Sequence, residues 1–317
     1  METKKSTIIS RSYYKKLFSD VKKDYLLYLM ILPGVIYFII FKYWPMYGIS
    51  IAFRDYSIFK GFADAPWVGV SHFTDLFSKP GFIRALKNNF IISFGKLLFG
   101  FPIPIILSLM INEIRSSKLK KVIQTTVILP NFVSWVVING LLFAMFSTGS
   151  GALVGVLRSL GYEGQAPNIL GNKDTFRSVI IISHIWKGAG MGTIVYLAAI
   201  TGVNPQLYEA ATIDGAGKFR RIWHITLASI RPTIVILLIF RIGQVMDAGF
   251  DQIFAISNSL VISVADIIDT YVYKLGLVQR NYSVATAAGL FKSLIGLMLV
   301  VLANAIAKKI DENSGII

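Results

Sequence analysis

The sequence lacks cysteine altogether and has few charged residues. With no cysteine among its 317 residues, disulfides and thiol chemistry are excluded. Charged residues make up 15% of the chain, against roughly 25% in soluble domains, which leaves little charge for a fully water-exposed surface. A net charge of +15 could favour a nucleic-acid partner. The basic residues, however, lie in short loops between apolar runs, so we expect no nucleic acid and a membrane protein instead.

Patterns typical of catalysis and metal binding are also missing. The three histidines form no metal-ligand spacing. A phosphate-binding loop needs glycine, four residues and then Gly-Lys-Ser/Thr. Here Phe219 follows Gly217 and Lys218, and Thr212 occupies the position of the first glycine. We therefore expect a chain that is not an enzyme and binds no cofactor or metal.

Six long apolar runs dominate the sequence. A bilayer-spanning helix needs about 20 apolar residues, and backbone groups in lipid must be satisfied internally. The apolar–polar alternation of a membrane β-barrel is absent. The fold class predicted is therefore an all-α membrane protein with six transmembrane helices, the first being a retained anchor that can run on through Trp44 and Tyr47. The predicted spans are Tyr25–Phe41, Phe90–Ile111, Val122–Phe146, Val179–Ile200, Thr233–Phe250 and Val284–Ala305.

Lysine and arginine in the loops indicate the orientation. The N-terminal segment, the tail and the two loops on the same side carry 17 of them, and the opposite loops carry 10. Positive residues favour the cytoplasmic side, so both termini are predicted to be cytoplasmic. The predicted organisation is a basic cytoplasmic segment at 1–24, a six-helix transmembrane domain at 25–310 and a short cytoplasmic tail at 311–317.

The cytoplasmic loop Asn204–Pro232 carries the most information. Asn204 is a good N-cap residue and Pro205 suits the first position of a helix, which is predicted to run to about Ile213. Asp214 and Gly215 then signal a turn, and a second amphipathic segment leads into the fifth span. Two short helices joined at a glycine make either a docking element or an ordinary interfacial loop, and the residues alone leave both open.

This loop resembles the EAA loop of permease subunits in binding-protein-dependent ABC importers. The family pattern is E-A-A, two residues, D-G-A, eight residues and I-x-L-P, and this chain has Ala228 at the last proline. The matching residues are Glu209, Ala210, Ala211, Asp214, Gly215, Ala216, Ile225 and Leu227. The resemblance implies that the loop inserts into a cleft of an ATPase subunit, with Glu209 and Gly215 central to coupling. ATP and Mg²⁺ would then be bound by that partner and not by this chain.

The rest of the chain is similar to oligosaccharide permeases of the maltodextrin and LplB type. The resemblance rests on the blocks Leu32–Tyr56, Gly249–Phe254, Ala265–Leu277 and Tyr282–Ser293. It implies a heterodimer with a second permease, an ATPase dimer and an extracellular solute-binding lipoprotein, in a bacterial plasma membrane. Abundant lysine and isoleucine are compatible with a Gram-positive source.

Polar residues inside the spans are candidates for a substrate path, because such residues are costly in lipid and usually face a cavity or another helix. Helical spacing places three sets on one face each: Asn131, Trp135 and Asn139 on the third span; His184, Lys187, Gly188 and Met191 on the fourth; Arg241, Gln244, Asp247 and Asp251 on the fifth. The resemblance implies sugar contacts at Asn131, His184, Gly188, Met191, Gln244 and Asp247. Bonding between helices, such as Arg241 with Asp247, stays open. So does an acidic sugar, which Lys187 and Arg241 would suit.

Three other functions are alternatives to an oligosaccharide importer, and the sequence favours them less. An ABC permease for a non-sugar solute is compatible with the EAA loop alone. A secondary transporter driven by an ion gradient would be favoured by inverted repeats or helices broken at mid-membrane, and neither is evident in the sequence. A membrane enzyme is disfavoured, because Gly188, Gly190 and Gly192 fit no dinucleotide-binding fingerprint and are expected to allow close helix packing.

Overall fold

The structure, a computed structural model, describes residues 22–59 and 61–310. In that part of the chain the secondary structure is helical, and β-structure is limited to an isolated bridge between Arg54 and Trp67. The chain divides into two compact units, Met1–Ile51 and Ala52–Ile317. Most of the predicted N-terminal segment (1–24) and all of the predicted tail (311–317) lie outside the described residues.

The N-terminal unit is built on one long helix. It begins with α2 (Tyr25–Phe38) and continues through a π-helical turn (Ile39–Tyr43) into a 3₁₀ segment (Trp44–Phe53) that ends just inside the larger unit. The whole stretch Tyr25–Phe53 is 29 residues long and apolar enough to span a membrane. The predicted first span is confirmed, and the helix does run on through Trp44 and Tyr47.

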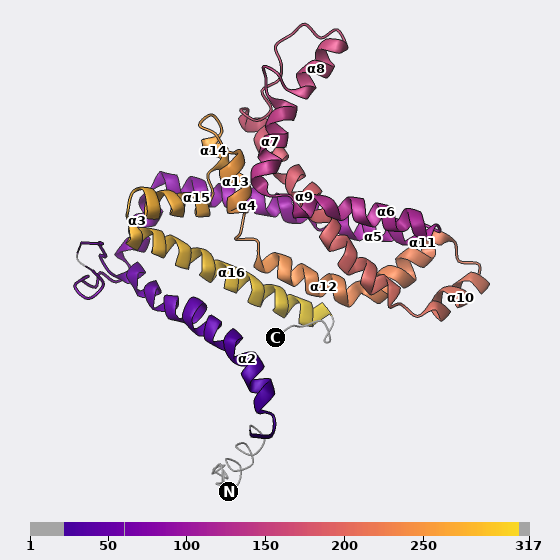
Figure 1. Cartoon of the computed structure of the whole chain (residues 1–317), viewed down its shortest axis with the longest axis horizontal. Helices are drawn as coiled ribbons and strands as arrows, with labels where there is room; N and C mark the ends of the chain where they lie inside the picture. Colours follow the sequence, from indigo (N-terminus) through magenta and orange to yellow (C-terminus); the bar gives the residue numbers. More distant parts are fainter. Residues whose placement is uncertain (1–21, 60, 311–317) are drawn as a thin grey trace. The chain divides into compact units, whose positions relative to one another are not determined.

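The larger unit is a layer of long helices joined by short ones (Figure 1). In the described residues its helices are α3 (Ser71–Ser78), α4 (Pro80–Gly100), α5 (Pro102–Asn112), α6 (Ser117–Ile128), α7 (Trp135–Phe146), α8 (Ala152–Ser159), α9 (Lys173–Thr201), α10 (Pro205–Ile213), α11 (Lys218–Arg221), α12 (Leu227–Gly243), α13 (Phe250–Ile256), α14 (Ile262–Ala265), α15 (Ile268–Tyr273) and α16 (Tyr282–Ile310). The helix α9 packs against α4, α5, α6 and α12, and α16 packs against α12 and α15. The α7–α8 region projects away from this layer (Figure 1).

Five helical stretches of the described chain can cross a membrane by length and composition, and a bent pair of helices makes a sixth if the pair is counted as one span. The predicted six spans correspond to this higher count, but not all of them have the predicted shape. The second, fourth, fifth and sixth stretches are Pro80–Asn112, Lys173–Thr201, Lys218–Gly243 and Tyr282–Lys309.

The predicted continuous third span, Val122–Phe146, is wrong. Its two halves, Ser117–Phe132 and Trp135–Phe146, meet at an angle of 100°. Val133 is extended, and the side chain of Ser134 caps α7 by accepting a hydrogen bond from the Val137 amide. The break lies in an apolar run, so hydropathy alone gives no sign of it.

The predicted end of the fifth span at Phe250 is also wrong, because α12 ends at Gly243. Gly249 takes a left-handed conformation with φ +88°, and a separate helix, α13, begins at Phe250. The predicted single face of Arg241, Gln244, Asp247 and Asp251 therefore does not exist, since only Arg241 lies on α12.

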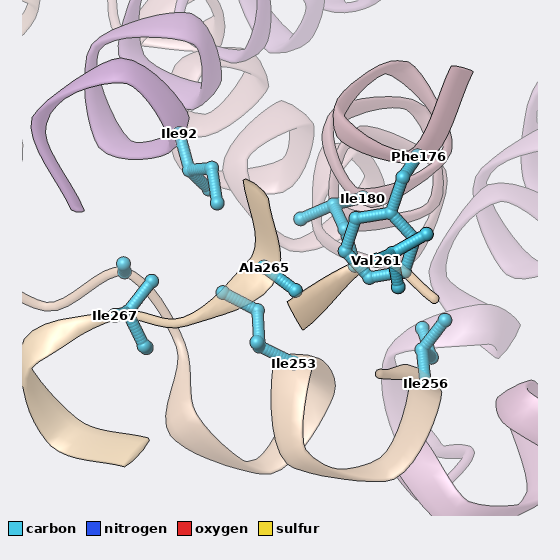
Figure 2. Close-up of a cluster of buried hydrophobic side chains, with 9 residues drawn as sticks. Ile92, Phe176, Ile180, Ile253, Ile256, Val261, Ala265 and Ile267 are labelled. Carbon is cyan, nitrogen blue, oxygen red and sulfur yellow. The ribbon is translucent and has the colours of Figure 1, made fainter. Parts of the chain in front are cut away.

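A buried cluster fixes the chain beyond this break. Figure 2 shows Ile92 of α4 and two α9 side chains, Phe176 and Ile180, around the segment that contains α13 and α14. That segment contributes Ala248, Ile253, Ile256, Val261, Ala265 and Ile267. Because these side chains are packed on two long helices, the loop that follows α12 is held in a defined place.

Candidate functional site

Side chains of α4 donate hydrogen bonds to the backbone carbonyls of the irregular segment that follows α12. The Asn89 Nδ2 group donates to the Met246 carbonyl at 3.2 Å, and the Lys96 ammonium donates to the Ala248 carbonyl at 2.7 Å. Irregular backbone at membrane depth is tolerated only where it is buried in protein or lines a cavity. These two side chains therefore allow the span to unwind after Gly243.

Lys96 belongs to a buried network that joins three segments. Its ammonium also donates to Gln252 Oε1 at 2.5 Å, and Gln252 Nε2 donates to the Ile180 carbonyl and Ser183 Oγ of α9 at 2.7 and 2.9 Å. A Cβ atom at Gly249 would lie 3.1 Å from the Lys96 ammonium, in a backbone conformation that favours glycine. This network could not be predicted from the sequence, because a lone lysine or glutamine in an apolar run does not reveal which loop it binds.

A cavity of about 190 Å³ lies beside this break, between α4, α9 and the end of α12. Four predicted path residues line it: His184, Gly188, Gln244 and Asp247. Arg241, which was placed on the same predicted face as Gln244 and Asp247, also lines it, together with two polar residues that were not predicted, Ser93 and Lys96. Much of the remaining wall is apolar and includes the Phe101 ring. A mostly apolar pocket with a few convergent polar groups is the usual form of a small-molecule site.

The first cavity shares lining residues with two neighbouring cavities. Asp247 lines both the first cavity and one of about 480 Å³ beside α13 and α15. Arg241 lines the first and a third of about 180 Å³, where the predicted residue Met191 lies. In the described part of the chain, no group of three His, Asp or Glu side chains could hold a metal ion.

The predicted residues Asn131, Trp135 and Lys187 meet at the other break, within the third span, and line none of these three cavities. The Lys187 ammonium donates to the carbonyls of Asn131 and Val133 at 2.7 and 2.6 Å, and it lies 5.7 Å from the centre of the Trp135 ring. A cation over an aromatic face is attracted by the ring quadrupole. Lys187 is thus engaged by the protein itself and satisfies the carbonyls freed by the bend.

The loop between α9 and α12 folds as the sequence predicts. Asn204 Oδ1 accepts a hydrogen bond from the Gln206 amide at 3.0 Å, and Pro205 opens α10. Gly215 has φ +73°, and the Ala216 amide donates to the Ala211 carbonyl at 2.8 Å. This is a glycine-terminated helix end in which left-handed geometry returns the chain toward the last turn.

The same loop presents an open surface. No residue of α10 is buried, and Ile213 and Phe219 are 88% and 87% exposed. The predicted coupling residues are all exposed or half-buried: Glu209, Ala210, Ala211, Asp214, Gly215 and Ala216. The loop thus leaves two large apolar side chains uncovered by the described part of the chain.

The protein is a polytopic helical membrane protein. It has long apolar helices, and two of its spans are broken at points where side chains of the protein itself bond to the freed backbone carbonyls. Cavities with polar side chains lie beside one of these breaks. Residues 100–312 match the family described as "Binding-protein-dependent transport system inner membrane component". The chain belongs to this family, and it is a permease subunit of an ABC importer.

Two relatives from Bacillus subtilis (strain 168) resemble nearly the whole chain. Protein LplB is 48% identical over 292 residues, which are 92% of this chain and 91% of LplB. The polygalacturonan/rhamnogalacturonan transport system permease protein YteP is 45% identical over 307 residues, which are 97% of this chain and 95% of YteP.

A solved structure has the same fold. The crystal structure of a bacterial ABC transporter involved in the import of the acidic polysaccharide alginate contains a chain with TM-score 0.86 and 42% identity, covering 93% of this chain and 99% of that one. The same transporter type, in complex with an alginate pentasaccharide-bound periplasmic protein, gives TM-score 0.85 and 42% identity, covering 93% of this chain and 98% of that one.

Broken helices, which are not evident in the sequence, are present in the structure, because the third span is bent at a break and the fifth ends early. Broken spans do not distinguish an ion-driven transporter from an ABC importer here. Family membership does, and it favours the importer.

Proposed function

We propose that this chain pairs with a second permease to form the path by which an ATP-driven importer takes up oligosaccharides. An extracellular binding lipoprotein would deliver the sugar, and a separate ATPase dimer would bind ATP and Mg²⁺. The observation that carries the proposal is the exposed α10–α11 loop. Two short helices meet there at a glycine turn, and the loop is hydrogen-bonded to the start of a membrane-spanning helix. The proposed location is a bacterial plasma membrane, Gram-positive as in the two Bacillus relatives.

Polar contacts fasten α10 to the start of the fifth span. The Tyr208 hydroxyl and Thr226 Oγ1 are 2.9 Å apart, and Arg221 donates to Thr212 Oγ1 at 2.9 Å. From Lys218 one helical stretch of 26 residues runs through α11, a π-helical turn (Ile222–Thr226) and α12 to Gly243, a length of about 39 Å. A force applied at α10 would therefore reach the end of α12, where the cavities begin.

A second contact fastens the loop to α5. Lys218 forms an ion pair with Glu113, directly after α5, with a distance of 2.9 Å. Because α5 packs on α9, movement of the loop would displace more than one span. This arrangement supports the proposed transfer of ATP-driven motion from α10 to the helices around the cavities.

The cavity chemistry suits a sugar. Gln244, Asp247 and Ser93 offer amide, carboxylate and hydroxyl groups to sugar hydroxyls, and Phe101 offers a ring to the apolar face of a pyranose. The relatives add support, since YteP is named for polygalacturonan and rhamnogalacturonan transport. In this proposal both termini and the α10–α11 loop lie in the cytoplasm. A reporter fused to the C-terminus should then be active inside the cell, and activity only outside would refute the orientation.

The coupling role is tested with two glycines of the same loop. Gly215 has φ +73°, so Gly215→Ala strains the turn by about 1–2 kcal/mol. Gly217 has φ −66° with no atom within 4 Å of an added Cβ, so Gly217→Ala is the matched control. Glu209→Lys reverses a charge on the docking surface. The readouts are co-purification of the ATPase and second permease from the host, and sugar-stimulated ATP hydrolysis.

We expect Gly215→Ala to lower stimulated hydrolysis roughly 5–30-fold, as a strain of that size predicts, and Glu209→Lys to lower it as well. Gly217→Ala should behave as the wild type. If the wild-type chain purifies alone or as a homodimer, the importer proposal fails. If Gly215→Ala and Gly217→Ala are equally active, the coupling role of this turn fails while the importer proposal stands.

A further inference from the structure

The first cavity is lined by more basic than acidic side chains. Two basic side chains, Lys96 and Arg241, line it together with one carboxylate, Asp247. His184, the remaining titratable group in the wall, can bond to a hydroxyl without carrying charge. A charge within membrane-spanning protein is costly unless it is paired or reaches water, so the partner of each basic side chain in this cavity has to be identified.

The two basic side chains differ in what they already bind. Lys96 is buried, and its ammonium donates to the Ala248 carbonyl and to Gln252 Oε1. These bonds hold the loop after α12, so the role of Lys96 is accounted for by the fold. Lys187 is likewise occupied by two backbone carbonyls at the third-span break.

Arg241 has no such partner. Within residues 22–59 and 61–310 its guanidinium makes no side-chain hydrogen bond and no ion pair, not even with Asp247 in the same cavity wall. It is exposed, lies in the last turn of α12, and lines both the first cavity and the neighbouring one of about 180 Å³. The interhelical pairing of Arg241 with Asp247 considered from the sequence is therefore not formed.

We infer that Arg241 binds the carboxylate of an acidic oligosaccharide during passage, so that this subunit selects uronate-containing sugars. The inference rests on the proposed function and names its substrate class. A guanidinium matches a carboxylate in a bidentate arrangement, which a neutral sugar cannot offer. Gln244 and Asp247, on the loop directly after α12, would bond to the hydroxyls of the same sugar.

Direct binding measurements test this assignment. The complete importer is purified without its binding protein, so that only the membrane path is probed. Isothermal titration then compares tri-galacturonate and tri-mannuronate with their carboxyl-reduced counterparts, which differ only in the acid groups. The variants are Arg241→Gln, Arg241→Lys and the control Arg231→Gln, an exposed arginine on the same helix about 15 Å away that lines none of the three cavities.

We expect at least one acidic trisaccharide to bind the wild type more tightly than its reduced form. Arg241→Gln should weaken that binding roughly 10–100-fold and change binding of the reduced form by less than about 3-fold, as loss of a hydrogen-bonded charge pair predicts. Arg241→Lys should retain part of the affinity, and Arg231→Gln all of it.

Each other outcome has a definite meaning. Equal binding of acidic sugar by wild type and Arg241→Gln, or no preference of the wild type for the acid, overturns the inference and leaves the importer proposal intact. Loss of the second permease from purified Arg241→Gln also overturns it, because Arg241 would then pair with a carboxylate of that subunit. Failure of both acidic and reduced sugars to bind the wild type counts against the proposed function itself.

Discussion

Gly190 and Gly188 lie two residues apart on α9 and face different surroundings. A Cβ atom on Gly190 would lie 2.1 Å from the Val127 carbonyl oxygen and 2.7 Å from the Ile128 Cα atom, both at the end of α6. A Cβ atom on Gly188 would meet nothing within 4 Å, because that position lines the first cavity. The predicted packing role is thus confirmed for Gly190 and does not apply to Gly188.

The cost of Gly190→Ala follows from this distance. Heavy atoms in ordinary contact are about 3.5 Å apart, so α9 and α6 would have to separate locally by more than roughly 1 Å. Overpacking of this kind costs about 1–3 kcal/mol, and more where backbone rather than a flexible side chain must move. Gly188→Ala raises the helix propensity by the same amount but causes no collision. The difference in stability between the two variants therefore measures the cost of the steric clash alone.

The assay is thermal denaturation of the detergent-purified importer, followed by size-exclusion chromatography. We expect Gly190→Ala to lower the apparent Tm by roughly 5 °C or more and Gly188→Ala to stay within about 2 °C of wild type. Equal midpoints for the two variants would refute the close approach of α9 to the third span. A large loss for Gly188→Ala would show that the cavity is closed at that position.

Three further predictions concern residues at the breaks in the third and fifth spans and at the first turn of α15. Lys187→Met leaves the Asn131 and Val133 carbonyls without their donor, at about 1–3 kcal/mol each, so its apparent Tm should fall clearly; a wild-type Tm would contradict the role of this lysine. Gly249→Ala, strained at φ +88°, should lose stability and sugar-stimulated ATP hydrolysis, whereas Gly289→Ala, with nothing within 4 Å, should lose neither. Lys292 and Asp269 form an ion pair of 2.6 Å between α16 and α15, so a double-mutant cycle with Lys292→Met and Asp269→Asn should give a coupling of about 0.5–3 kcal/mol; additive effects would mean that the pair contributes nothing.

Local sequence features predicted much of the fold. The apolar runs located the membrane-spanning stretches because the bilayer sets the length of each helix. Asn204, Pro205 and Gly215 predicted where α10 begins and ends, because capping and left-handed turns depend on a few neighbouring residues. The residues of the α10–α11 loop were likewise found from the sequence, and their coupling role remains a prediction.

The breaks in the third and fifth spans were decided by tertiary structure. A span can bend only if other parts of the chain satisfy the freed carbonyls, and those partners are distant in sequence: Lys187 is 56 residues from Asn131, and Lys96 is 152 residues from Ala248. Helical periodicity, continued past the end of α12, predicted that Arg241, Gln244 and Asp247 lie on one helix face. The helix ends at Gly243, before Gln244 and Asp247. The three residues do share a cavity, but through a loop anchored on α4.

The sequence by itself determined that this protein spans a membrane with helices and presents a capped helix–turn–helix loop, since both depend on composition and short-range spacing. Only the tertiary structure decided which basic side chains hydrogen-bond to the backbone at the breaks. Lys96, Lys187 and Arg241 are equally conspicuous as charges in apolar runs. Their surroundings differ because, within residues 22–59 and 61–310, long-range packing brings backbone carbonyls to the two lysines and none to the arginine.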